Sequence, residues 1–427
     1  MASRRSPWLW IPSLYFTEGI PYVVVMTVAV IMYKKFGISN TKIALYTSWL
    51  YLPWVIKPFW SPLIDIVRTK RWWIVTMQLL IGAGMAGVAF TIPASNFLQY
   101  SMAFLWLMAF SSATHDIAAD GFYMLGLSSH EQAWFVGIRS TFYRLAMIAG
   151  QGLLVMFAGH FEETIGLTSA WVLTFYCLAG LFLALFAYHG LFLPKPTEDR
   201  PNVSADLSSV FSQFLVTFVT FFQKKNILSI LVFLMFYRLA EAQLVKMASP
   251  FLLDSRQVGG LALSTTQVGF VYGTMGVVML TLGGILGGLL AARQGLKYWL
   301  WWMALAINLP NAVYVALSIF QPESFLAVNL AVAVEQFGYG FGFTAYMLVM
   351  LYVAQGEHET AHYAICTGFM ALGMMLPGMV SGWLQESIGY QKFFIWVMVS
   401  TLPSFAVCWL IPLSSEFGKN QVEKESH

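Results

Sequence analysis

Charged residues are scarce in this sequence of 427 residues. Asp, Glu, Lys and Arg make up only 10% of it, and hydrophobic residues make up 58%, whereas soluble domains carry roughly 25% charged residues. The mean hydropathy is correspondingly high, at +0.68. A soluble fold would lack the polar surface that it needs, so the composition indicates a protein of the lipid bilayer.

Other absences exclude further classes of function. The 23 basic residues are thinly spread and the net charge is only +3, so there is no basic patch for nucleic acid. The 3 cysteines have no CxxC spacing, so neither a disulfide framework nor a zinc site is indicated, and we interpret them as packing residues. No Walker sequence GxxxxGK[ST] occurs, so we do not expect ATP-driven transport by this chain.

Long apolar runs dominate what is present. A helix that crosses a bilayer needs roughly 20 residues, and we predict an all-α membrane protein with twelve such helices in two pseudo-symmetric halves of six. The first run is longer than the core of a signal peptide, so we interpret it as a retained span. The predicted spans are 8–33, 43–64, 72–93, 97–127, 134–159 and 169–193 in the first half, and 227–253, 264–292, 297–320, 324–355, 361–386 and 390–413 in the second.

A polar break separates the halves. Within it, apolar residues between Leu207 and Phe222 recur at helical spacing behind Asp206, a residue suited to cap a helix. Serines and Gln213 make this segment too polar for a thirteenth span, so we predict a helix that lies on the membrane surface. The predicted domains are an N-terminal six-helix bundle (1–193), a cytoplasmic linker with the interfacial helix (194–226), a C-terminal six-helix bundle (227–413) and a cytoplasmic tail (414–427).

Lys and Arg are concentrated in the loops that would share a side with the N-terminus. The positive-inside rule therefore places both termini in the cytoplasm. Two six-span halves joined by a cytoplasmic linker are typical of parallel-repeat transporters, in which substrate binds between the halves near the membrane midplane. Glycine-rich runs at 283–288 and 338–342 are expected to let helices approach closely.

Two carboxylates lie four residues apart inside an apolar run. A helix would stack Asp116 and Asp120 on one face, and ionisable residues inside a membrane mark functional sites by default. Counted from the turn near Ser129, Asp120 lies level with Arg139, and Asp116 lies level with Arg144. We predict two level-matched pairs, with Asp120 held ionised by Arg139 and Asp116 as the better candidate to exchange protons.

Spans one and seven carry acids at corresponding positions. Glu18 stands beside Gly19 and Pro21, which interrupt the backbone ladder, and Glu241 follows Arg238 by one helical turn. Broken spans at corresponding positions point to a binding site, although charges that pair internally only to fix helix packing remain the alternative. The predicted proton-coupling residues are Asp116, Asp120, Glu18, Glu241 and Glu335, and the predicted substrate-binding residues are Arg139, Arg144, Arg238, Lys246, Tyr15, Tyr143 and Tyr237.

Two further ionisable residues are interpreted as structural. Lys57 lies close to the inner interface, where its ammonium group can snorkel to water. His115 is interpreted as a hydrogen-bonded packing residue. We predict no catalytic residue and no metal ligand.

Loops at corresponding places in the two halves share a pattern. Residues 61–71 and 288–297 both resemble, imperfectly, the GxxxD[RK]xG[RK] loop of the major facilitator superfamily. A carboxylate at a helix end can pair with loop cations and latch one access state. We therefore predict gating roles for Asp65, Arg68, Arg71 and Arg293; the alternative is that the arginines only set orientation.

Five motifs occur in the two halves, namely KPFWSPLID from Lys57, HDIAADG from His115, YRLAM from Tyr143, STTQVG from Ser264 and EQFGYG from Glu335. Together they resemble the AmpG-type muropeptide permeases, in the peptide–acetyl-CoA transporter branch of the same superfamily. The chain departs from the pattern in lacking room for the two additional spans of several such permeases. It also has Tyr123, Met124 and Leu125 where charged residues can follow the second aspartate.

The resemblance implies a proton symporter that works by alternating access in a bacterial inner membrane. Its substrate would be a small molecule, an anhydro-muropeptide or a related amino-sugar glycopeptide from the cell wall, whose carboxylates the basic residues would neutralise. The proton gradient would drive transport without a cofactor, and we expect a monomer in the lipid bilayer.

Other functions fit the same residues. One is a transporter of the same superfamily for another sugar or anionic small molecule. Another is a membrane enzyme acting on lipid-linked substrates with His115, Asp116 and Asp120 as metal ligands, although the acids are distributed over both halves and we do not expect an enzyme. A third is a sensor or scaffold that transports nothing.

Overall fold

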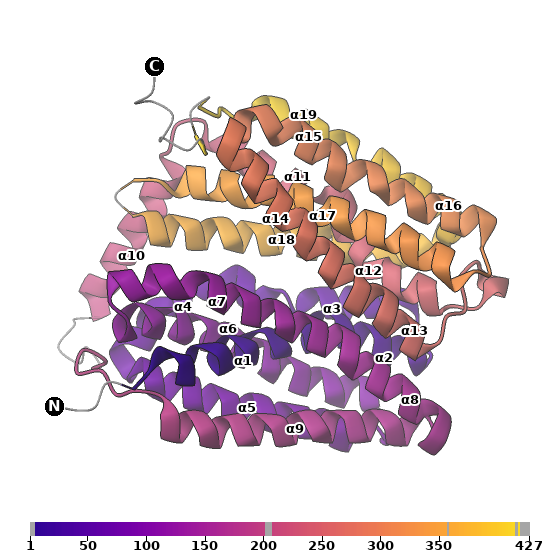
Figure 1. The fold of residues 1–427 in the computed structure, drawn as a ribbon, viewed down its shortest axis with the longest axis horizontal. Helices are drawn as coiled ribbons and strands as arrows, with labels where there is room; N and C mark the ends of the chain where they lie inside the picture. Colours follow the sequence, from indigo (N-terminus) through magenta and orange to yellow (C-terminus); the bar gives the residue numbers. More distant parts are fainter. Residues whose placement is uncertain (1–4, 201–206, 357, 415–416, 419–427) are drawn as a thin grey trace. The chain divides into compact units, whose positions relative to one another are not determined.

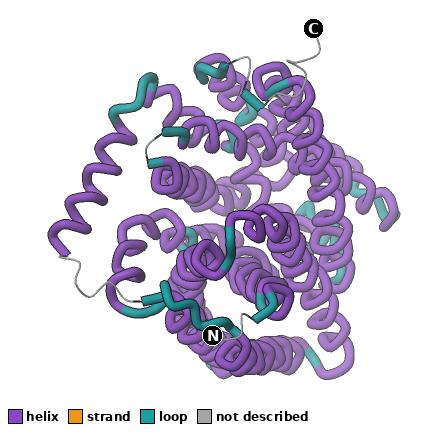
Figure 2. The backbone as a smooth tube through the Cα atoms, turned by 60° about the vertical axis from the view of Figure 1, so that its left-hand side comes forward, coloured by secondary structure: helices purple, strands orange, loops and turns teal. Residues whose placement is uncertain are grey.

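The computed structural model describes residues 5–200, 207–356, 358–414 and 417–418. These residues form helices joined by short loops and contain no strand, as Figure 1 and Figure 2 show. The all-α class that the composition predicts is confirmed.

Helices occupy each predicted span of the first half. The first and fifth spans each continue through a π-helical turn, at Val24–Val28 and Ile148–Leu154. The first of these turns follows Pro21, which has no N–H to donate to the helical ladder. The helices are α1 (Ile11–Val23), α2 (Ala29–Lys35), α3 (Asn40–Trp49), α4 (Leu52–Val67), α5 (Lys70–Thr91), α6 (Phe97–Gly126), α7 (Ser129–Met147), α8 (Val155–Ile165) and α9 (Leu167–Phe192).

The second half also has a helix at every predicted span. The longest, α18, contains Gly389 with φ 78°, a left-handed conformation that glycine adopts without steric strain, and the kink falls between the two predicted spans. The helices are α11 (Ile227–Phe236), α12 (Leu239–Leu253), α13 (Thr265–Val268), α14 (Gly276–Gln294), α15 (Leu296–Asn308), α16 (Ala312–Phe320), α17 (Phe325–Ala354), α18 (Glu359–Val399) and α19 (Leu402–Leu410).

The length and hydropathy of these helices suit a membrane. Within the described residues, 9 continuous helical segments are long and apolar enough to cross one, and the segment of 52 residues from Glu359 to Leu410 contains the kink at Gly389. The predicted spans 43–64 and 97–127 are helical as well, in α3 with α4 and in α6.

The linker contains the predicted helix, α10 (Leu207–Phe222). Asp206, its predicted cap, lies outside the described residues. The position of α10 on the membrane surface remains a prediction. Its later part belongs with α18, because Thr220 Oγ1 lies 3.2 Å from His362 Nε2.

Contacts divide the chain into two compact units. Unit 1 comprises Met1–Gly37, Ile56–Phe214 and Ser264–Gly273, and unit 2 comprises Ile38–Val55, Leu215–Leu263 and Thr274–His427. The start of the second span thus belongs with unit 2, and the start of the eighth with unit 1. The predicted domain boundaries, which follow the order of the sequence, remain predictions.

Each unit packs long helices side by side. In unit 1, α5 lies against both α6 and α9, and α1 lies against α7 (Figure 1). In unit 2, α14 and α17 approach so closely at Gly340 that a Cβ atom there would collide with the carbonyl oxygen of Leu280. The glycine-rich runs therefore permit close packing.

Of the cysteines, Cys366 and Cys408 are buried, whereas Cys177 is exposed, so the packing interpretation is wrong for Cys177.

Candidate functional site

Three carboxyl groups and two cations meet inside unit 1. Lys57 Nζ, from α4, donates a hydrogen bond to Asp116 Oδ2 on α6. Arg139 Nη2, from α7, lies 3.0 Å from Asp120 Oδ1, also on α6. We define the acidic cluster as Tyr15, Glu18, Lys57, Asp116, Asp120 and Arg139.

Glu18 is the third carboxyl group of the acidic cluster. Its carboxyl group lies close to that of Asp116, and its Oε2 atom is buried with no hydrogen-bond partner in the described part of the chain. Gly19, the residue after Glu18, allows a close helix contact, because a Cβ atom built at Gly19 would lie 2.7 Å from the Cβ of Ala146 on α7. Helix α1 therefore packs directly on α7 beside the acid.

Tyr15 closes one side of the acidic cluster. Its hydroxyl donates to Asp120 Oδ1 at 3.3 Å. The Arg139 guanidinium carbon lies 4.6 Å from the centre of the Tyr15 ring and 5.0 Å from that of Tyr123, a cation–π arrangement. These contacts hold Arg139 and Asp120 together.

The structure agrees with one of the two level-matched pairs that the sequence predicts and contradicts the other. Asp120 pairs with Arg139, as predicted, but Asp116 pairs with Lys57 and not with Arg144. The interpretation of Lys57 as a snorkelling residue is therefore wrong. Counting residues from a turn predicts equal depth only for helices that are joined by that turn. Lys57 lies on α4, which α5 separates from α6 in the chain.

The remaining predicted residues of unit 1, Tyr143 and Arg144, lie on α7, the helix that also carries Arg139. Arg144 is half-buried on α7. Its neighbour Tyr143 contacts the site of Gly19, where a Cβ atom would lie 3.1 Å from the Tyr143 carbonyl oxygen.

A buried polar network behind the acidic cluster was missed by the sequence analysis. Ser13 Oγ lies 2.9 Å from His189 Nε2, and His189 Nδ1 lies 3.0 Å from Gln78 Oε1. Gln78 Nε2 in turn lies 3.0 Å from His115 Nε2, next to Asp116. The interpretation of His115 as a hydrogen-bonded packing residue is confirmed. Polar residues isolated within apolar runs were the only signal for Gln78 and His189.

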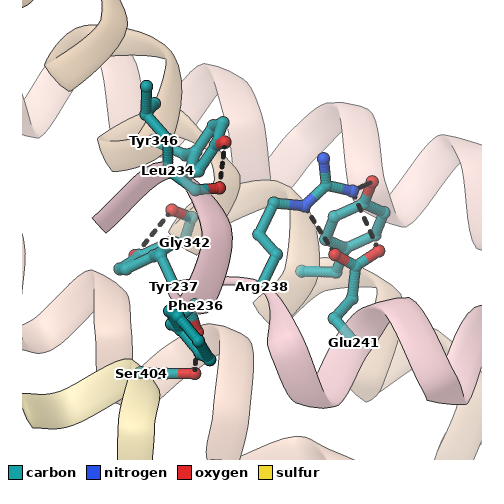
Figure 3. A network of polar contacts seen from close by, with 9 residues as sticks. Leu234, Phe236, Tyr237, Arg238, Glu241, Gly342, Tyr346 and Ser404 are labelled. Carbon is teal, nitrogen blue, oxygen red and sulfur yellow. Dashed lines mark hydrogen bonds and ion pairs between the residues drawn. The ribbon is translucent and has the colours of Figure 1, made fainter. Parts of the chain in front are cut away.

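Unit 2 contains a second buried charge pair. Arg238 stands where the seventh span breaks between α11 and α12, and its Nε lies 2.6 Å from Glu241 Oε2 (Figure 3). Arg238 Nη2 also donates to the hydroxyl of Tyr339 at 2.8 Å. Tyr237, predicted to bind substrate, is completely buried and donates to the Gly342 carbonyl at 3.0 Å. Its placement favours packing.

Two other predicted residues of unit 2, Lys246 and Glu335, are also buried. Lys246 Nζ donates to Thr47 Oγ1 at 2.9 Å. Glu335 accepts a hydrogen bond from Gln336 Nε2 at 2.9 Å. Within the described residues, neither side chain has an ion-pair partner.

The predicted gating residues are not brought together among the described side chains. The side chain of Asp65 lies outside the described residues. Arg68 lies over the Trp72 ring, 5.9 Å from its centre, and Arg293 is exposed in the last turn of α14. Arg71 donates to the Gly190 carbonyl at the end of α9. Their gating roles remain predictions.

Asp199 is a further residue that the sequence analysis missed. Its carboxylate accepts hydrogen bonds from the backbone N–H groups of Lys70 and Arg71 at 2.7 and 3.0 Å. These N–H groups lack partners within α5 because they begin the helix. The linker residue therefore caps α5, in the loop that carries the predicted gating residues.

The described residues contain no group of three His, Cys, Asp or Glu side chains arranged to hold a metal ion. What unit 1 offers instead is an ion-paired cluster with one more carboxyl group than cations. Such a cluster can take up and release a proton inside a membrane.

Curated relatives extend over most of the chain. It is 25% identical over 403 residues to the anhydromuropeptide permease of Escherichia coli, a match that covers 91% of this chain and 76% of that protein. It is 24% identical over 406 residues to the putative transporter AmpG 4 of Rickettsia conorii, covering 92% and 94%. The predicted resemblance to AmpG-type permeases is confirmed.

Solved structures show the same fold. The nucleoside transporter NupG matches with a TM-score of 0.70 at 14% identity, over 94% of this chain and 99% of that one. A bacterial homologue of the human lysosomal transporter Spinster, in an inward-facing and unoccupied conformation, matches with a TM-score of 0.68 at 15% identity, over 96% of each chain. The family model of the Major Facilitator Superfamily matches residues 13–362. The chain therefore belongs to the major facilitator superfamily, with twelve membrane-spanning helices in two pseudo-symmetric halves.

Proposed function

We propose that this transporter is a proton symporter that imports an anhydro-muropeptide, or a related amino-sugar glycopeptide, by alternating access. The substrate class is supported by the name of the Escherichia coli relative and by the motifs shared with AmpG-type permeases. The proton gradient supplies the driving force, and no cofactor is required. We further propose a monomer in a bacterial inner membrane with both termini in the cytoplasm.

The charge balance of the acidic cluster carries the proposal of proton coupling. Three carboxyl groups face two cations, so full ionisation would leave one negative charge in excess inside the membrane. An isolated buried charge is strongly unfavourable. A proton on Glu18 or Asp116 removes the excess.

In this proposal the charged residues have different roles. Asp120 stays ionised against Arg139, because this pair is also held by Tyr15. Asp116 alternates between two states, one ion-paired with Lys57 and one protonated, as the site opens to one side of the membrane or the other. Arg144, Arg238 and Lys246 neutralise substrate carboxylates, and Glu241 and Glu335 are further candidates for the proton.

Uptake into membrane vesicles tests the proposal. Labelled anhydro-muropeptide, anhydro-sugar and peptide are offered with and without an inward proton gradient. We expect the gradient to drive accumulation of the anhydro-muropeptide, and the Asp116→Asn variant to lose this accumulation. If the wild type accumulates none of the three compounds, the substrate class is wrong. If Asp116→Asn accumulates substrate like the wild type, the proton role of Asp116 is wrong.

A further inference from the structure

Lys246 is a buried lysine that has no carboxylate partner in the described part of the chain. Its side chain on α12 is only 3% exposed. Its ammonium group contacts the hydroxyl of Thr47 on α3, at 2.9 Å, and lies 5.3 Å from the centre of the Tyr51 ring. No carboxylate pairs with it among the described residues, and Lys246, Thr47 and Tyr51 all belong to unit 2. Since an unpaired charge is unfavourable in a buried site, an anion bound here would stabilise the ammonium form of Lys246.

Hydrogen-bond donors around Lys246 exceed acceptors. An ammonium group has three N–H donors, and Thr47 accepts one of them. The Thr47 hydroxyl itself donates to the Ile43 carbonyl at 2.7 Å, so it has no further hydrogen to offer or to share. Two N–H donors of Lys246 are left without an acceptor in the described part of the chain.

Ser48 adds a third unused donor beside the same space. Its side chain is completely buried, and its Oγ has no hydrogen-bond partner among the described residues. Gly378 on α18 borders both groups, since a Cβ atom built there would lie 2.7 Å from Ser48 Oγ and 3.6 Å from Lys246 Cε. Glycine therefore lets the serine hydroxyl and the lysine side chain lie directly against the backbone of α18.

We propose that Lys246, Ser48 and Gly378 form a carboxylate-binding subsite in unit 2. The proposal rests on the transport function proposed above and names the substrate group that this site recognises, a single carboxylate such as the one that ends a peptide. A carboxylate brings one negative charge, which balances Lys246, and two oxygens that accept from Lys246 and Ser48. An amide of the same shape brings acceptor and donor atoms but no charge, so it is excluded.

The subsite is closed in this structure, because Lys246 is almost completely covered. Thr47 accepts a hydrogen bond from the ammonium group in this structure. Binding therefore requires α3 to move from α12, which replaces the Thr47 contact with two charge-assisted hydrogen bonds. Alternating access provides such a movement.

Binding of small carboxylates to the purified full-length protein tests the subsite without transport. N-acetylalanine and its uncharged amide are titrated while the melting temperature is followed. We expect only the acid to stabilise the wild type. Lys246→Met should abolish the difference between acid and amide, and Ser48→Ala should weaken binding of the acid about tenfold, the effect of one hydrogen bond to a charged group.

Exposed residues of unit 2 provide matched controls, namely Lys392→Met and Ser387→Ala, which should bind like the wild type. Ser48→Ala removes only a hydroxyl, so it keeps the test valid if Lys246→Met does not fold. Equal stabilisation by acid and amide would overturn the proposal, and so would unchanged binding of the acid by Ser48→Ala. If proton-driven uptake occurs with no preference for the acid, the subsite is contradicted and the transport function is not. If the acid binds but no uptake occurs, the transport function is contradicted and the subsite is not.

Discussion

The ion pair between Lys57 on α4 and Asp116 on α6 joins residues 59 positions apart in the chain. Each side chain is only 19% exposed, so removal of either leaves a poorly hydrated charge behind. The aspartate also lies close to the buried carboxyl group of Glu18 on α1. Asp116 therefore lies between a cation and a second acid.

A double-mutant cycle should show that Lys57 and Asp116 stabilise each other. We expect Lys57→Met and Asp116→Leu each to lower the stability of the purified protein, and the double variant to recover part of the loss, with an interaction energy of about 1–3 kcal/mol. Thermal unfolding in detergent measures the four proteins, and Lys42→Met, at an exposed lysine, serves as the control. Additive losses would mean that the two charges do not support each other.

Removing the surplus carboxyl group should remove the dependence of uptake on the proton gradient. With Glu18→Gln, the cluster has two acids for two cations, so no proton is needed to balance it. We expect acidification outside the vesicles to accelerate uptake by the wild type and to have no effect on the variant, which should still exchange labelled for unlabelled substrate. Glu163→Gln alters an exposed acid on α8 and should respond like the wild type. An undiminished response in Glu18→Gln would assign the proton elsewhere.

The polar network behind the acidic cluster should contribute stability. Gln78 is completely buried between His115 and His189, and Gln78→Leu leaves both imidazoles without this partner. A buried polar group that loses its hydrogen bond costs about 1–3 kcal/mol, so the melting temperature should fall. Gln99→Leu, at an exposed position on α6, should change it little. Equal melting temperatures for the two variants would contradict the role of the network.

Two glycines of unit 2 should respond differently to the same substitution. At Gly340 a Cβ atom would collide with the backbone of Leu280, whereas at Gly288 it would meet nothing within 4 Å. Gly340→Ala should therefore separate α14 from α17 and lower the melting temperature. Gly288→Ala should leave it unchanged or raise it, because alanine favours a helix by about 1 kcal/mol over glycine. Tolerance of alanine at Gly340 would show that the helices can move apart without loss.

Some tertiary contacts were predictable because the chain itself brings the residues together. Asp120 and Arg139 lie on helices joined by the short turn before Ser129, and equal distances from a turn place residues at equal depth. Arg238 and Glu241 are one helical turn apart. In both cases, local geometry limits the partners to a few positions.

The helical class, the twelve spans and the costly charges within them could be predicted from the sequence, because bilayer thickness sets the length of an apolar run and charged residues inside such a run are rare. The partners of these charges depend on tertiary packing. Lys57 reaches Asp116, Gln78 joins His115 to His189, and Thr47 receives Lys246. Which faces of distant helices pack together depends on the sum of many side-chain contacts, and periodicity within a single helix does not contain that information.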